Sequence, residues 1–172
     1  SDVWDVCFLA IDPVRSAGIL FSPPYVIIEG TYLVRKDSSL REVGDVDRPG
    51  SRVAVSRGSA YDLFLTRALR HAEIRRDNSG DDAFAAFRNQ QLEALAGVRQ
   101  ALMKLAAGNP QLRVMSSRFM EIRQAMGTLA GRVAGARYLH TFIEEMKLSG
   151  FVAKALADSG QADASVAPPE RS

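Results

Sequence analysis

Apolar and polar residues follow each other along the chain in short segments, whose spacing switches between that of strands and that of helices. Between residues 52 and 115 the switch is regular. Strands are predicted at residues 52–56, 73–76, 92–98 and 112–115, and helices at residues 59–69, 81–89 and 99–107. This alternation is typical of a parallel sheet with helices on both faces, so the predicted fold class is α/β.

The N-terminal segment is predicted to be mostly extended. A buried strand is predicted at residues 3–10. A short helix then runs from Asp12 to Gly18, because Asp suits an N-cap and the following Pro suits the first helical position. The proline-rich residues 21–25 predict a stiff loop. Residues 25–36 are rich in β-formers, and the glycine in their middle indicates a crossing between two bodies.

The C-terminal segment predicts one more strand and two helices. The strand covers residues 119–126, and the helices cover residues 131–148 and 151–156. Residues 161–172 are small, polar and rich in proline, so they are expected to be disordered.

Composition narrows the function classes. Apolar residues make up 47% of the chain and charged residues 24%, as in ordinary globular proteins. The formal net charge is only +2, which argues against a dedicated nucleic-acid-binding protein. No apolar stretch approaches the roughly 20 residues needed to cross a bilayer. The single cysteine, Cys7, excludes an internal disulfide and a cysteine-clustered zinc site.

One turn has the pattern of an anion-binding site. A strand ends before Gly58, which permits a tight backbone, and Ser59 can cap the helix that continues through Ala60 and Tyr61. The free N–H groups of a first helical turn attract anions. The alternative is a plain strand-to-helix turn with a good cap, which every α/β sheet contains.

Few other residues indicate chemistry. Arg15 lies in the first turn of its predicted helix, where a cation is unfavourable, so a carboxylate partner is one explanation and a solvated arginine the other. His140 and Glu144 have i, i+4 spacing, but two residues do not make a metal site. His71 belongs to a basic run that is typical of a solvated face. No metal or cofactor is predicted, and the residues give little support to an enzyme.

Several short segments together resemble a known family. They are residues 8–15 (FLAIDPVR), 21–25 (FSPPY), 33–38 (LVRKDS), 49–55 (PGSRVAV), 57–61 (RGSAY) and 146–151 (MKLSGF). Their order and spacing are similar to those of the family 3 extracellular solute-binding proteins, which are receptors of polar amino acid ABC transporters. The resemblance covers nearly all of residues 3–158.

The resemblance implies a two-lobe periplasmic protein that captures a small carboxylate-bearing solute for a transporter permease. Lobe one would comprise residues 1–32 and 120–160, and lobe two residues 33–119, with a disordered tail from residue 161. The chain would cross between the lobes near residues 30–32 and 121–123. Its site residues would be Arg15 on lobe one, and Gly58, Ser59, Ala60, Tyr61 and Arg99 on lobe two.

Two departures from the family pattern shape these expectations. The first strands of lobe one would precede Ser1, so lobe one is expected to be incomplete and its exposed edge to favour a homodimer. Ala10 and Val98 stand where the family binds an ammonium group, and no acid is assigned to balance Arg99. An organic acid is therefore expected as the ligand, rather than a zwitterionic amino acid.

Three alternatives stay open. The chain resembles the cyclohexadienyl dehydratases on the same fold, in which case Glu121 is the candidate general acid. It can also be a ligand-sensing domain of a signalling protein, or a degenerate relative without a ligand.

Overall fold

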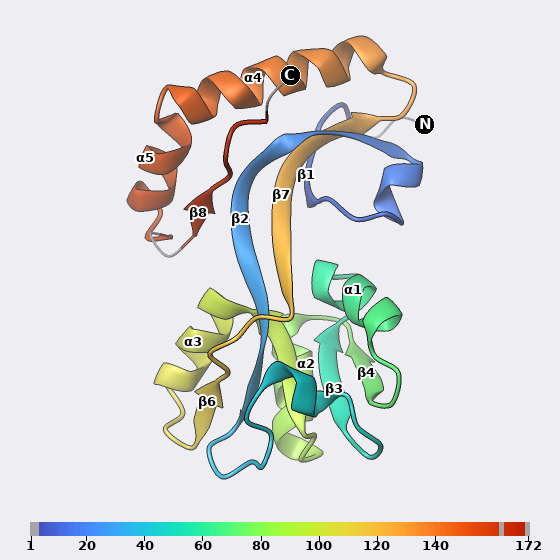
Figure 1. The fold of residues 1–172 in the computed structure, drawn as a ribbon, viewed down its shortest axis with the longest axis vertical. Coiled ribbons are helices and arrows are strands. Elements are labelled where there is room, and N and C mark those ends of the chain that lie inside the picture. The colour runs from blue at the N-terminus through green and yellow to red at the C-terminus, as the bar shows by residue number, and fades with distance from the viewer. Residues whose placement is uncertain (1–3, 162–163, 171–172) are drawn as a thin grey trace. The chain divides into compact units, whose positions relative to one another are not determined.

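The computed structural model describes residues 4–161 and 164–170. The chain divides into two compact units (Figure 1). Unit 1 comprises Ser1–Ile28 and Ile122–Ser172, and unit 2 comprises Glu29–Glu121. Two strands, β2 (Ile19–Arg35) and β7 (Met120–Leu129), contribute to both units.

Unit 2 contains a five-stranded mixed sheet in the order β6–β2–β5–β3–β4. The strands β3 (Arg52–Ser56), β4 (Glu73–Asp77) and β5 (Ala94–Val98) are parallel, with Val53 opposite both Ile74 and Ala94. β2 runs antiparallel to β5, and β6 (Leu112–Val114) runs antiparallel to β2. A 3-10 turn at Val43–Val46 lies between β2 and β3.

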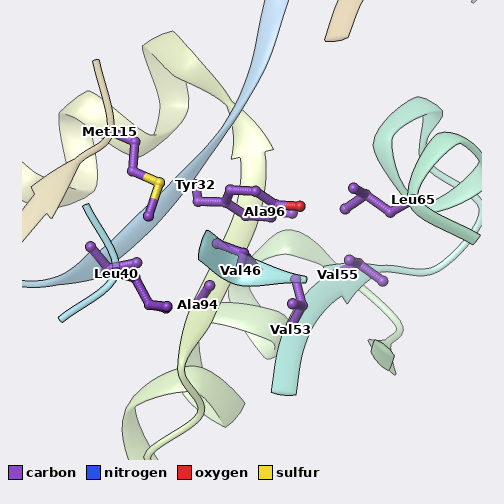
Figure 2. Packing of buried hydrophobic residues seen from close by; sticks show 10 residues of the cluster. Tyr32, Leu40, Val46, Val53, Val55, Leu65, Ala94, Ala96 and Met115 are labelled. Atoms are coloured by element: carbon purple, nitrogen blue, oxygen red, sulfur yellow. The ribbon is translucent and has the colours of Figure 1, made fainter. Parts of the chain in front are cut away.

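Helices cover both faces of this sheet, as the sequence predicts. They are α1 (Ala60–Ala68), α2 (Gly80–Asn89) and α3 (Arg99–Ala107). Strand alternation places Val53 and Val55 in one core cluster with Leu65 of α1, as Figure 2 shows. Ala54 points to the opposite cluster, which contains residues of α2 and α3. The α/β class is confirmed.

Unit 1 is built differently, because its described strand pairings are antiparallel. β1 (Cys7–Ala10) pairs with β7, with Cys7 opposite Gly127, and β8 (Ser165–Val166) pairs with β2. The helices α4 (Val133–Leu148) and α5 (Phe151–Asp158) follow β7, and Ile143 of α4 packs with Met126 of β7. A parallel-rich sheet was expected for both lobes, and within residues 4–161 and 164–170 the parallel pairs β3–β4 and β3–β5 both belong to unit 2.

The N-terminal segment corrects two local expectations. Residues 21–25 are not a stiff loop, because they lie inside β2. Pro23 and Pro24 cannot donate a backbone N–H to a neighbouring strand, but Ser22 beside them keeps a contact with β7, because its hydroxyl accepts the N–H of Met126 at 3.1 Å. The helix predicted from Asp12 is only the 3-10 turn Arg15–Ala17, although Asp12 does accept the N–H of Val14 as a cap would.

The expected disorder of the C-terminal tail is wrong for its described part. Residues 164–170 are ordered, and Ala167 is only 2% exposed and donates its N–H to Tyr25 O. The ammonium group of Lys147 also donates to Pro24 O at 3.2 Å and to Pro168 O at 3.0 Å. Composition misses this order because the partners lie on other elements. Residues 162–163 and 171–172 of the tail lie outside the described residues.

Candidate functional site

The turn between β3 and α1 joins a glycine of left-handed conformation to a capped helix N-terminus. Gly58 adopts a φ of +71°, which only glycine tolerates without strain. Ser59 is the N-cap of α1, and its hydroxyl oxygen accepts the N–H of Asp62 at 3.1 Å. The N–H groups of Ala60 and Tyr61 belong to the first helical turn, where an α-helix offers no acceptor. The N–H of Ser59 itself donates to Ser56 O.

The buried carboxylate of Asp62 stabilises this turn through hydrogen bonds. Asp62 is 4% exposed and accepts the N–H of Gly58 at 2.8 Å and the Nε of Arg76 at 2.9 Å. Thr66 donates its hydroxyl to the backbone carbonyl of Asp62 at 2.7 Å, and the same hydroxyl lies 3.3 Å from the carboxylate. The sequence reasoning missed Asp62 and Arg76. The Ser-x-x-Asp spacing from Ser59 to Asp62, which is typical of a helix N-terminus, could have indicated the first of them.

Tyr61 lies beside an aromatic cluster in unit 2. Tyr61 and Phe64, both on α1, pack against the first core cluster together with Phe119. The rings of Phe64 and Phe119 stack with centroids 5.9 Å apart, and Phe119 lies 4.6 Å from the ring of Tyr32. Packing thus fixes the first two turns of α1 on the sheet.

Arg99 donates to three protein acceptors. Its Nε donates to Glu29 at 2.6 Å, and its Nη1 and Nη2 donate to the carbonyls of Met115 and Ser116, both at 2.9 Å. The expectation that no acid balances Arg99 is therefore wrong. Glu29 lies 70 residues away in sequence, and a single sequence gives no signal for that pairing.

Glu29 belongs to a neutral network of two glutamates and two arginines. Arg118 donates to Glu29 and to Glu121, each at 2.8 Å. Hydrogen bonds from Arg118 and then from Arg99 lower the pKa of Glu29. Glu121, the candidate general acid, is thus held by an arginine.

Arg15 lies in unit 1, whereas Gly58, Ser59, Ala60, Tyr61 and Arg99 lie in unit 2. Arg15 is half-buried, and its Nη1 donates to Ala10 O at 3.0 Å.

The remaining candidates stay without a chemical role. Among the described residues, no group of three or more His, Cys, Asp or Glu side chains could hold a metal ion. Cys7 is half-buried rather than fully buried, its Sγ donates to Gly127 O at 3.5 Å, and burial raises the pKa of its thiol. None of the helices in residues 4–161 and 164–170 combines the length and hydropathy that a membrane span requires.

Comparison with solved structures decides the fold family. A variant of ArgBP from T. maritima matches with a TM-score of 0.74 and 22% identity, over 90% of this chain and 68% of that one. The fold is that of an amino acid substrate-binding protein. The cysteine-binding protein of Campylobacter jejuni matches with a TM-score of 0.77 and 18% identity, over 92% of this chain and 64% of that one. No protein-family model and no curated protein sequence matches the chain.

One of the matched structures with the substrate-binding-protein fold is the precursor of an enzyme. The ancestral amino acid-binding protein AncCDT-1, a precursor of cyclohexadienyl dehydratase, matches with a TM-score of 0.73 and 21% identity, over 90% of this chain and 68% of that one. The fold is therefore compatible with solute capture and with a descendant enzyme, and the site must distinguish them.

Proposed function

We propose that the chain is a solute-binding protein of an ABC transporter, which captures a small carboxylate-bearing solute between two lobes. The observation that carries this proposal is the substrate-binding-protein fold, matched over 90% of the chain. Unit 1 and unit 2 would be the two lobes. A periplasmic location and a transporter permease as partner belong to the same proposal, since the matched proteins include the substrate-binding protein of an amino acid ABC transporter.

The solute carboxylate would bind to groups from both lobes. Arg15 would grip it from unit 1, because a planar guanidinium matches a carboxylate in a bidentate way. From unit 2, the N–H groups of Ala60 and Tyr61 would donate to it, together with the hydroxyl proton of Ser59. Gly58 would serve by its backbone conformation, since its N–H already binds Asp62.

The ligand class is an organic acid or an amino-acid-like acid. The absence of side-chain acceptors at Ala10 and Val98 supports an organic acid, whereas Arg99 no longer does, because Glu29 neutralises it. Arg99 would then hold Glu29 and the carbonyls of Met115 and Ser116 in position rather than touch the solute.

A thermal-shift panel of carboxylates and L-amino acids tests the proposed function. A solute present at 100 times its dissociation constant should stabilise the chain by about 2.7 kcal/mol. At the same solute concentration, Arg15→Ala should reduce this stabilisation to less than about 1 kcal/mol. A panel in which no carboxylate and no amino acid raises the melting temperature would contradict the proposal.

The dehydratase reading is the second candidate, because AncCDT-1 shares the fold. It requires a general acid, and Arg118 already holds Glu121. We therefore propose binding without catalysis. Turnover of a prephenate-like acid that is lost in Glu121→Gln would reverse this choice.

We also propose a homodimer formed through unit 1. Its described surface exposes apolar side chains, including Phe8 at 64% and Phe151 at 60%. Both line a groove of about 450 Å³ whose other walls are almost wholly apolar. Exposed apolar surface of this kind favours association. Light scattering tests the proposal, and a monomer at high protein concentration would contradict it.

A further inference from the structure

A single arginine connects the two places where the chain passes between the units. Glu29 on β2 is the first residue of unit 2, and Glu121 on β7 is the last. Arg118 donates Nη1 to Glu29 and Nη2 to Glu121, each at 2.8 Å. Its guanidinium plane thus spans both crossing strands.

The backbone beside this arginine is held just as closely. The N–H of Phe119 donates to Gly30 O at 3.0 Å, and the hydroxyl of Thr31 donates to Ser117 O at 2.7 Å. A methyl group added at Gly30 would lie 2.8 Å from Met120 Cγ and 2.9 Å from Phe119 Cε2, so these side chains would have to shift to accommodate it. Hydrogen bonds therefore connect residues 29–31 of β2 to residues 117–121 at and before the start of β7.

We propose that Arg118 is a positioning residue that clamps the two crossing strands to each other, so that they bend together when the solute binds. This inference rests on the proposed function, because only a protein whose lobes close needs coordinated crossings. Arg118 itself would not touch the solute. Lysine cannot replace it, since a point-like ammonium lacks the planar fork that holds two carboxylates in fixed geometry.

Hydrogen exchange on the full chain without solute tests the clamp directly. In Arg118→Gln and in Arg118→Lys, amides on both crossing strands, at residues 26–31 and 120–125, should exchange about 3- to 5-fold faster, as expected for the loss of a partly exposed ion pair. Sodium chloride at about 1 M should produce the same increase in the wild type, because it screens the bridge.

Arg75→Gln is the matched control. Arg75 is 50% exposed, as Arg118 is 48% exposed, and it pairs with Asp77 on β4 away from the crossings. Its loss should leave residues 26–31 and 120–125 unchanged. Three results would overturn the clamp: faster exchange confined to one strand, faster exchange spread evenly over unit 2, or no faster exchange in either Arg118 variant. Each of them is expected of an arginine that stabilises the fold without linking the two strands.

Binding of L-arginine and of succinate, measured by calorimetry, separates the two proposals. If the wild type binds either probe, Arg118→Lys should weaken that binding about 3- to 5-fold, and unchanged affinity would overturn the positioning role. If the wild type binds neither probe nor any panel solute, the proposed function fails, whereas the exchange data still decide whether the clamp exists.

Discussion

Removing the carboxylate of Asp62 should destabilise the chain far more than its position on a helix suggests. Asp62→Ala leaves the N–H of Gly58 and the Nε of Arg76 without their acceptor, whereas Thr66 keeps its 2.7 Å hydrogen bond to the backbone carbonyl of residue 62. An unsatisfied buried group costs about 1–3 kcal/mol, and the charge lost from the first helical turn adds about 0.3–1 kcal/mol. Because Gly58 is exposed and Arg76 is partly exposed, we discount both shares and expect a total loss of about 1–2 kcal/mol.

The chain contains a matched control for this prediction. Asp82 stands in the same Ser-x-x-Asp position of α2, and its N–H likewise donates to the hydroxyl of Ser79, but its side chain is exposed. Asp82→Ala should cost less than about 1 kcal/mol, because it removes only the favourable helix charge and an exposed hydrogen bond from the Ser79 hydroxyl. Urea unfolding of both variants is the assay. Equal losses for Asp62→Ala and Asp82→Ala would refute the reasoning, because burial and the Gly58 contact would then contribute nothing.

Other expectations concern the crossings, the solute and the tail. Gly30→Ala should cost about 1–3 kcal/mol in urea unfolding, because its methyl group would lie 2.8 Å from a side-chain carbon at the start of β7. The pKa of Glu29 is held below its ordinary value of 4.5. The stabilisation that the ionised carboxylate gives is therefore present above pH 4.5 and is lost as the pH falls through the folded-state pKa. Glu29→Gln should flatten this part of the acid-unfolding curve. Arg15→Ala should weaken solute binding at least about 30-fold in calorimetry, and should lower the unfolding free energy by only about 0.5–1.5 kcal/mol through loss of the hydrogen bond to Ala10 O. Lys147→Met should speed hydrogen exchange at residues 164–170, because Pro168 O loses its donor; unchanged exchange there would show that β8 pairing alone holds the tail.

Local signals in the sequence carry much of the fold of unit 2. Helix α3 begins at Arg99 and ends at Ala107, as predicted, and its end is indicated by a glycine and a proline that follow within three residues. Ser59 caps α1 for an equally local reason. Such features depend on neighbours within a few positions, so one sequence is enough to find them.

Features that depend on residues far apart in the chain could not be predicted from the sequence. Glu29 meets Arg99 across 70 positions, and this one pairing changes the charge expected at the site. The proline-rich segment at residues 21–25 looked like a loop because its compensating contact, from Met126 to Ser22, spans 104 positions. The ordered tail depends in the same way on Lys147.

The low reactivity expected of the Cys7 thiol makes this chain convenient for fluorescent labelling at introduced cysteines. A half-buried thiol whose pKa burial raises holds little thiolate at neutral pH, so it reacts slowly with maleimides. Cysteines introduced at exposed positions, such as Met103 in unit 2 and Lys154 in unit 1, would react first. A donor–acceptor dye pair at those two positions would then report solute-dependent changes in distance without removing the native thiol.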